Sequence, residues 1–373
     1  MISPMEQPPR KRLFTPGPLT TSRSVKEAML VDAGSRDDDF IATVREVRRK
    51  LLEAGGVSQQ GGYEATLIQG SGTFGIESVL SSAVPPSGKL LILINGAYGE
   101  RMLTIATRHK IPNDALRWPE NEITNPAAVE QRLAQDRSIT HVAVVHSETT
   151  TGILNPIEEI GPLVRAAGRC HIVDAMSSFG AVPLSLETAC IDFLVSSANK
   201  CIEGVPGFSF VLARAEALQA CKGNARTLSL DLFEQWHGLE TNGQFRFTPP
   251  THAILAFAQA LRELELEGGV GARAHRYREN HATLMAGMKA LGFKPYLSPE
   301  HQGWIISAFH YPDDPAFKFE EFYRQLAARG MIIYPGKLGK VPCFRIGNIG
   351  QLHPSDMTDL LEAIKDVMRL MKF

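Results

Sequence analysis

The stretch LVSSANKC, Leu194–Cys201, is the part of this sequence that decides the fold. An apolar run typical of a buried strand ends in small polar residues, and a single lysine, Lys200, follows them. Upstream, HIVDA at 171–175 closes a second apolar run with an acidic residue, Asp174. The spacing between Asp174 and Lys200 leaves room for one strand–crossover–strand unit, so we expect both residues at the ends of neighbouring strands.

Strand-like and helix-like segments alternate from about residue 60 to residue 215. This alternation is typical of an α/β fold with a mainly parallel sheet that is covered on both faces. Ligands of such sheets bind beyond the carboxyl ends of the strands, where the sequence places His146, Asp174 and Lys200. The apolar runs predict strands at 89–94, 141–145, 170–173, 191–195 and 208–212, with helices such as 156–167 between them.

The C-terminal part of the chain has a different pattern, which predicts a smaller α+β domain. We therefore expect an N-terminal arm (1–16), a large domain (17–265) and a small C-terminal domain (266–373). The pattern behind this division is a long helical segment at about 251–291, strand-like segments at 303–309, 331–334 and 341–346, and helical segments at 317–328 and 356–371.

The composition is that of an ordinary globular protein. The 373 residues are 44% hydrophobic and 21% charged, and the net charge is −1, so the composition gives no reason to expect nucleic acid or an anionic membrane as a partner. No apolar run has the length that a membrane span needs. The five cysteines show no metal-binding spacing, so we expect no metal site, and they fit reduced thiols in the cytoplasm.

Three segments near the expected strand ends are rich in glycine or hydroxyl groups. GSGT at 70–73 precedes a helical segment whose free N–H groups would bind a phosphate, and a flexible turn is the alternative. Tyr98, between glycines, would lie over a flat cofactor, and a partly buried loop tyrosine is the alternative. The hydroxyls of HSETTTG at 146–152 would bind a phenolate-like oxygen or, alternatively, cap the helix that begins near Pro156.

Lys200 and Asp174 together indicate a specific chemistry, although each alone has an ordinary explanation. A lysine after a strand is commonly a solvated loop residue, and an aspartate at a strand end is commonly a cap or turn residue. However, a lysine that bonds to an aldehyde and an aspartate that pairs with a ring nitrogen are what a pyridoxal phosphate (PLP) enzyme needs most. The pair therefore predicts a PLP site.

Seven short motifs, and their order along the chain, resemble those of the fold-type-I PLP-dependent aminotransferases of class V. The resemblance runs from about Phe14 to the C-terminus. Class V includes alanine–glyoxylate and serine–pyruvate aminotransferases, and the chain most resembles its 2-aminoethylphosphonate–pyruvate aminotransferase branch, notably at 241–252. The motifs are TPGP (15–18), GSGT (70–73), NGAYGER (95–101), HSETTTG (146–152), VDAMSSFG (173–180), SSANK (196–200) and FRIG (344–347).

The resemblance implies a role for each matched position. Lys200 would hold PLP covalently and carry out the proton transfer, and Asp174 would pair with the ring nitrogen. Thr248 would reach the PLP phosphate from the neighbouring subunit of a homodimer with shared active sites. The remaining implied contacts are Ser71, Gly72 and Thr73 at the phosphate, Tyr98 on the ring face, Thr149 at the ring hydroxyl and Arg345 at the substrate anion.

The resemblance also implies an activity: a cytoplasmic homodimer that transfers the amino group of 2-aminoethylphosphonate to pyruvate. One alternative is a class-V aminotransferase that uses another donor, such as alanine or serine, with glyoxylate or pyruvate. A second alternative is a catalytically silent protein with the same fold, and the retention of Lys200, Asp174 and Arg345 argues against it. A cysteine desulfurase is disfavoured because Cys343 lies in a strand-like run, a poor place for a mobile nucleophile.

Overall fold

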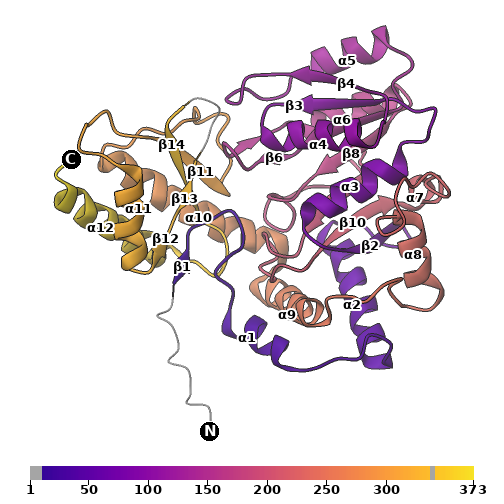
Figure 1. Cartoon of the computed structure of the whole chain (residues 1–373), viewed down its shortest axis with the longest axis horizontal. Helices are drawn as coiled ribbons and strands as arrows, with labels where there is room; N and C mark the ends of the chain where they lie inside the picture. The colour runs from indigo at the N-terminus through magenta and orange to yellow at the C-terminus, as the bar shows by residue number, and fades with distance from the viewer. Residues whose placement is uncertain (1–10, 337–340) are drawn as a thin grey trace.

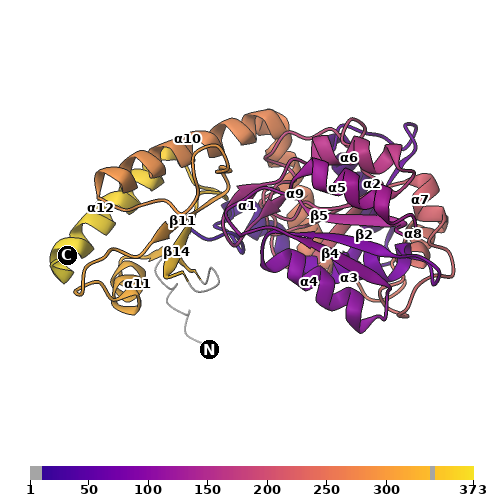
Figure 2. The same cartoon turned by 90° about the horizontal axis from the view of Figure 1, so that it is seen from above.

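The computed structural model describes residues 11–336 and 341–373. Residues 1–10 of the predicted N-terminal arm lie outside these ranges. The described chain forms a large α/β part and a smaller part built from its C-terminal residues. The helix α10 (Gly269–Ala290) runs from the large part along the smaller one, as Figures 1 and 2 show.

The large part is built on a sheet whose described portion has the strand order β2-β10-β9-β8-β5-β3-β4. In that portion β10 is antiparallel to β2 and β9, and the other neighbouring pairs are parallel, which confirms the predicted, mainly parallel sheet. Each predicted strand of this part lies within two residues of an observed one. The strands are Tyr63–Gln69 (β2), Leu90–Ile94 (β3), Asn113–Arg117 (β4), His141–Val145 (β5), Cys170–Asp174 (β8), Phe193–Ser197 (β9) and Phe208–Arg214 (β10).

The sheet is covered by helices on both faces, which explains why its central strands are apolar along their whole length. Alternate side chains of β3 point to opposite faces: Leu90, Ile92 and Ile94 join one core cluster, and Leu91 and Leu93 join the other. Figure 2 shows α3 and α4 on one side of the sheet and α2, α5 and α6 on the other. These helices are Asp38–Ala54 (α2), Gly72–Ala83 (α3), Ala97–Arg108 (α4), Pro126–Gln135 (α5) and Ile157–Ala166 (α6).

The smaller part contains an antiparallel sheet of order β11-β14-β13 that packs against α11 and α12. Phe14, from the N-terminal end of the described chain, is buried in the same core, because β1 (Arg12–Leu13) pairs with β12 (Met331–Ile332). The other elements of this part are Ile306–His310 (β11), Tyr334–Pro335 (β13), Cys343–Gly347 (β14), Phe319–Ala328 (α11) and Pro354–Met371 (α12).

The long helical segment predicted at 251–291 is two helices rather than one. The helix α9 (Thr251–Glu267) ends where Gly268 adopts a φ of 108°, in the left-handed region that closes helices, and α10 follows directly. The predicted domain boundary after residue 265 falls in the last turn of α9, and it stays a prediction.

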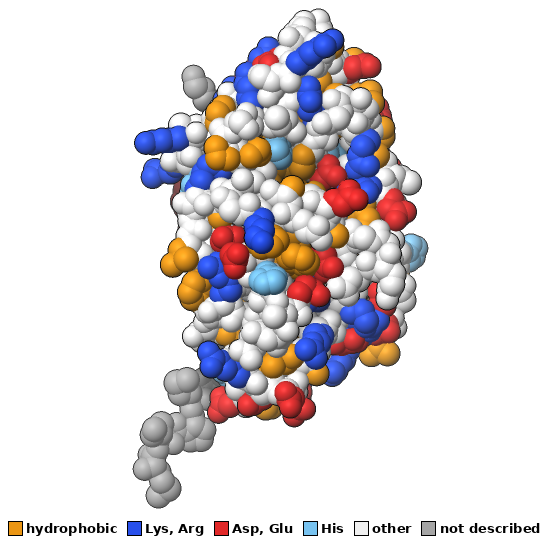
Figure 3. All heavy atoms as spheres, turned by 90° about the vertical axis from the view of Figure 1, so that its right-hand side faces the viewer, with side chains coloured by type: hydrophobic (Ala, Val, Ile, Leu, Met, Phe, Trp, Pro, Cys, Tyr) orange, Lys and Arg blue, Asp and Glu red, His pale blue; other side chains and the backbone are white. Residues whose placement is uncertain are grey.

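The surface agrees with the balanced composition. Figure 3 shows one face of the molecule on which cationic and anionic side chains are interspersed, with small groups of hydrophobic side chains between them. Among the described helices, none combines the length and the apolarity that crossing a bilayer requires.

Candidate active site

A cavity of about 210 Å³ lies at the carboxyl ends of the parallel strands. The turns after β2, β3, β5, β8 and β9 all contribute to its wall, because the parallel strands end at one edge of the sheet. Residues that are far apart in the sequence therefore meet there. The predicted site residues that line the cavity are Ser71, Gly72, Thr73, Tyr98, Thr149, Asp174 and Lys200.

Lys200 and Asp174 face this cavity in an environment that disfavours charge on both side chains. Burial lowers the pKa of Lys200 to about 8 and raises the pKa of Asp174 to about 6. Lys200 lies in the turn after β9 and Asp174 is the last residue of β8. An amine that loses its proton this easily is suited to attack a carbonyl carbon.

Both side chains are held by hydrogen bonds with the backbone. The Asp174 Oδ1 accepts from the Met176 N–H at 2.9 Å, and the Lys200 Nζ donates to the carbonyl of Pro16 at 2.6 Å. Gly17 follows Pro16 with a φ of 128°, and a Cβ there would lie 2.9 Å from the Lys200 Cδ. The TPGP motif therefore needs its glycine because the backbone passes directly over the lysine.

The first turn of α3 forms one end of the cavity. Ser71 is the N-cap residue of this helix, so the N–H groups of Gly72 and Thr73 begin the helix and point toward the cavity end. Arg101 adds a positive charge here, because its Nη1 donates to the Thr73 hydroxyl at 3.2 Å. A helix N-terminus beside a guanidinium is suited to hold an anion such as a phosphate.

Tyr98 and Thr149 also line the cavity. The Arg101 guanidinium lies 4.7 Å from the centre of the Tyr98 ring, so one arginine touches both the ring and the first turn of α3. The buried Thr149 hydroxyl shares a 2.6 Å hydrogen bond with the Ser177 hydroxyl. Pro156, without a side-chain cap, precedes α6, so the hydroxyls of 146–152 do not serve as the cap of that helix.

Arg345 lies beside the cavity but does not line it. It comes from β14 of the smaller part, and its Nη1 donates to the Thr149 carbonyl at 3.0 Å. Its Nη2 donates to the Pro335 carbonyl at 3.0 Å, and the guanidinium lies 4.8 Å from the centre of the Tyr334 ring. The smaller part thus brings a cation to the loop that carries Thr149.

Thr248, like Arg345, is a predicted site residue that does not line the cavity. Its side chain is exposed, while its carbonyl accepts from the Gln69 Nε2 at 2.6 Å. Gln69 ends β2, directly before the turn that leads to α3. Thr248 is therefore close to that turn in the same chain, but its side chain is exposed.

Sequence reasoning assigned no role to several residues that line the cavity. Arg101 is three positions after Tyr98, a spacing that places both on one face of a helix, so helical periodicity is the signal that identifies it. The others are Ile76, Met102, Met176, Ser197 and Asn199, and only the assembled structure brings them to the cavity.

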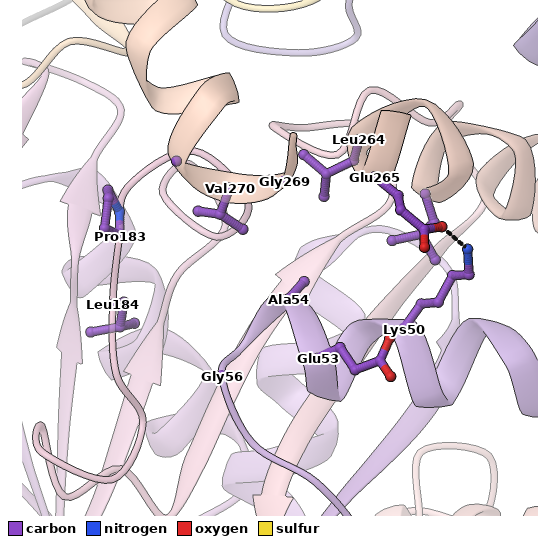
Figure 4. Close-up of a pocket in the computed structure, with 12 residues that line it drawn as sticks. Lys50, Glu53, Ala54, Gly56, Pro183, Leu184, Leu264, Glu265, Gly269 and Val270 are labelled. Atoms are coloured by element: carbon purple, nitrogen blue, oxygen red, sulfur yellow. Dashed lines mark hydrogen bonds and ion pairs between the residues drawn. The ribbon is translucent and has the colours of Figure 1, made fainter. Parts of the chain in front are cut away.

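A second cavity, of about 410 Å³, lies at the junction of α2, α9 and α10 (Figure 4). Its wall is mainly apolar, and Lys50 forms an ion pair with Glu265 at its edge. The predicted site residues do not contribute to this cavity, so it is not the candidate active site.

Comparison with known proteins places this architecture in a family. The family model described as aminotransferase class-V matches residues 34–333. This chain is a class-V aminotransferase. It is 52% identical to a 2-aminoethylphosphonate–pyruvate transaminase of Salmonella heidelberg (strain SL476) over 362 residues, which cover 96% of this chain and 98% of the relative.

Solved structures agree with this membership. The class-V aminotransferase fold described above matches the pyridoxamine–pyruvate aminotransferase of Mesorhizobium loti with a TM-score of 0.89 and 25% identity, over 99% of this chain and 95% of the other. The ureidoglycine–glyoxylate aminotransferase of Bacillus subtilis matches with a TM-score of 0.90 and 22% identity, over 99% and 96%, which bears on the fold alone. These matches confirm the predicted fold class, and membership of this family implies dependence on PLP.

The residues around the cavity fit PLP. A phosphate suits the first turn of α3 with Arg101 beside it, an aldehyde suits the buried amine of Lys200, and a ring nitrogen suits the buried carboxyl of Asp174. Among the described residues the one hydrogen bond to the Asp174 carboxyl is from the Met176 N–H, so a protonated ring nitrogen would supply the positive partner that the buried carboxylate lacks.

Proposed function

We propose that this class-V aminotransferase transfers the amino group of 2-aminoethylphosphonate to pyruvate, which yields phosphonoacetaldehyde and L-alanine. The observation that carries the proposal is the joint presence of Lys200, Asp174 and Arg345 around one cavity, in a chain 52% identical over nearly its full length to a transaminase of that name. The proposal includes PLP as the cofactor and a homodimer as the working form.

The side chains divide the work between the cofactor and the substrate. We infer that Ser71, Gly72 and Thr73 hold the PLP phosphate, that Tyr98 stacks on the ring and that Thr149 binds the ring hydroxyl. When bound, PLP supplies an electron sink for the carbon that loses a proton, and the Asp174 carboxylate keeps the ring nitrogen protonated. The Lys200 Nζ, with its lowered pKa, is the group placed to accept the proton from the amine-bearing carbon of the donor.

The proposed reaction is tested with amines that share one carbon skeleton. We expect the protein with PLP and pyruvate to form L-alanine from 2-aminoethylphosphonate and much less from taurine or β-alanine, which carry a sulfonate or a carboxylate instead. Chromatography would detect L-alanine and phosphonoacetaldehyde together. Equal or faster turnover of L-alanine or L-serine with glyoxylate would favour the alternative class-V activity, and an absence of turnover with every pair would contradict an aminotransferase.

Replacing Arg345 by lysine should weaken the binding of both substrates far more than the binding of PLP. Lysine keeps the charge but loses the planar fork that binds two oxygens at once, and hydrogen bonds to charged groups contribute about 1.5–3 kcal/mol. We expect KM for the donor and for pyruvate to rise by about 10–100-fold. Steady-state kinetics at varied concentrations of each substrate would measure both values.

The control for this variant is Arg369→Lys, because Arg369 is exposed on α12 and, among the described residues, its one ion pair is with the nearby Asp366. A KM increase confined to 2-aminoethylphosphonate would show that pyruvate is held by another group. An unchanged KM for both substrates would remove Arg345 from the substrate site.

The homodimer is proposed because polar and apolar groups near the phosphate end of the cavity face solvent. Phe74, in the first turn of α3, is 49% exposed and Phe247, beside Thr248, is 43% exposed. Large exposed apolar side chains in one region are typical of surfaces that another protein covers. A second copy that covers them would bring a hydroxyl such as that of Thr248 to the neighbouring phosphate site.

Replacing Thr248 by valine should weaken PLP retention by about 10–100-fold without changing the secondary structure, since a hydrogen bond to a charged phosphate contributes about 1.5–3 kcal/mol. Dialysis against a PLP scavenger, followed by the visible absorbance of the bound cofactor, would measure the loss. Thr358→Val, on the exposed side of α12, is the matched control. Equal retention in both variants, or a fully active monomer at high dilution, would contradict the shared site.

A further inference from the structure

Glu148 is a buried carboxyl that stands behind the cavity wall, outside the set of residues assigned above. It ends the short strand β6 (Ser147–Glu148), and its exposed fraction is 0%. Among the described residues it forms no ion pair. Burial raises the pKa of this carboxyl to about 7, so the neighbouring N–H and O–H groups decide whether a charge there is tolerated.

The donors that meet this carboxyl come from two separate segments. The Glu148 Oε2 accepts from the Tyr98 N–H at 3.2 Å, and the Oε1 accepts from the Thr150 N–H at 3.3 Å and the Thr150 hydroxyl at 2.8 Å. The Tyr98 N–H belongs to the first turn of α4, where backbone N–H groups lack helical partners and a carboxylate is favourable.

Each of these segments carries a group that we assign to the cofactor. Tyr98 is the proposed ring-stacking residue, and Thr149, between Glu148 and Thr150, is the proposed partner of the ring hydroxyl. The Thr149 carbonyl also accepts from Arg345. At Gly96 a Cβ would overlap the Glu148 carboxyl group, so the backbone before Tyr98 lies directly against this side chain.

We propose that Glu148 is a positioning residue, which sets the Tyr98 ring and the Thr149 hydroxyl at a fixed separation by binding the backbone of both segments. This inference rests on the proposed function, because the proposed function is what makes Tyr98 and Thr149 contacts of the same cofactor. A carboxylate suits the task because each of its two oxygens accepts hydrogen bonds, one for each segment. This proposal does not change which substrates we expect, since Glu148 does not line the cavity and, within the described chain, forms no hydrogen bond or ion pair with Arg345, the residue proposed to bind the substrate anion.

The test is Glu148→Gln, which keeps the size of the side chain but offers only one acceptor oxygen. Whichever way the amide turns, its NH₂ group faces one of the two backbone N–H groups. We expect the PLP dissociation constant to rise by about 10–100-fold, because a buried donor left without an acceptor destabilises the arrangement by a factor of that size. For the same reason, hydrogen exchange at the Tyr98 amide of the cofactor-free chain should quicken by about tenfold. Fluorescence titration and exchange mass spectrometry on residues 95–101 would measure the two effects.

Glu64→Gln is the matched control, because Glu64 is also a buried carboxyl on a strand but pairs with Arg48, away from the cavity. It should leave the PLP dissociation constant within about threefold of wild type, the usual context dependence of such effects. A loss of affinity as large as that of Glu148→Gln would show that removing any buried carboxyl weakens the site, and would overturn the proposal.

A double-mutant cycle with Tyr98→Leu separates positioning from general support of the fold. If Glu148 acts in part through the tyrosine ring, Glu148→Gln should weaken PLP binding by a clearly smaller factor in the Tyr98→Leu background than in wild type. Additive effects, in a wild-type protein that binds PLP and transaminates, would overturn the role of Glu148 alone. A wild-type protein that retains no PLP would overturn the proposed function together with it.

Discussion

Replacing Lys200 by alanine should abolish turnover while the fold remains. The variant loses both the amine that bonds to PLP and the group that moves the proton, and a positioned acid–base group alone contributes up to about 10⁴-fold. We therefore expect kcat to fall by at least about 10⁴-fold. PLP would still bind weakly through its phosphate and ring contacts.

A readout other than activity identifies the covalent bond of Lys200. Reduction with borohydride followed by denaturation should leave the cofactor on the wild-type chain, at the peptide that contains residue 200, and should release it from Lys200→Ala. Lys222→Ala is the control, since Lys222 is an exposed lysine outside the cavity. Activity of Lys200→Ala within about tenfold of wild type, or about 1.4 kcal/mol, would exclude Lys200 as the catalytic lysine.

The pKa of Lys200 predicts how cofactor capture depends on pH. Only the neutral amine attacks an aldehyde, and burial lowers its pKa to about 8. The rate of PLP incorporation into the cofactor-free protein should therefore rise with pH up to about 8 and level off above it. Stopped-flow absorbance at several pH values would measure this rate, and a rate that keeps rising to pH 10 would contradict the lowered pKa.

Asp174→Asn should give a protein that binds PLP but transaminates about 10²–10³-fold more slowly, the usual cost of removing one preorganised charge from a reacting centre. A neutral amide cannot hold the proton on the ring nitrogen, so the electron sink is weakened. The amide oxygen still accepts from the Met176 N–H, which keeps the turn after β8 in place. Single-turnover rates and the absorbance spectrum of the bound cofactor would measure the change.

The same variant tests the raised pKa of Asp174. In wild type, PLP affinity should fall as the pH decreases through about 6, because the carboxyl becomes protonated there. A phosphate also titrates near pH 6, so the difference between wild type and Asp174→Asn isolates the carboxyl. Asp192→Asn, at the amino end of β9, is the control, and an identical rate in Asp174→Asn and wild type would remove Asp174 from the site.

Local sequence patterns predict most of this fold because they report on burial. The run at 90–94 is apolar throughout and the run at 141–145 is apolar after His141, which is what strands covered on both faces require. By contrast, no local pattern shows that β10 runs antiparallel to β2 and β9, because the direction of a strand depends on the path of the whole chain. The split of the helical segment at 251–291 does have a local signature, the paired glycines Gly268 and Gly269 between α9 and α10.

The sequence by itself determined the family and the strands β3, β5, β8, β9 and β10, but not β2 and β4. It also determined the positions of Lys200 and Asp174, because polar residues that follow apolar runs must lie at the ends of the strands of a parallel sheet. Only the tertiary structure decided which distant groups meet there: Pro16 over Lys200, Arg345 on the Thr149 loop and Glu148 behind Tyr98. The lowered pKa of Lys200 and the raised pKa of Asp174 were also decided only by the tertiary structure. Both depend on desolvation by segments remote in the chain, and no local pattern of residues carries that information.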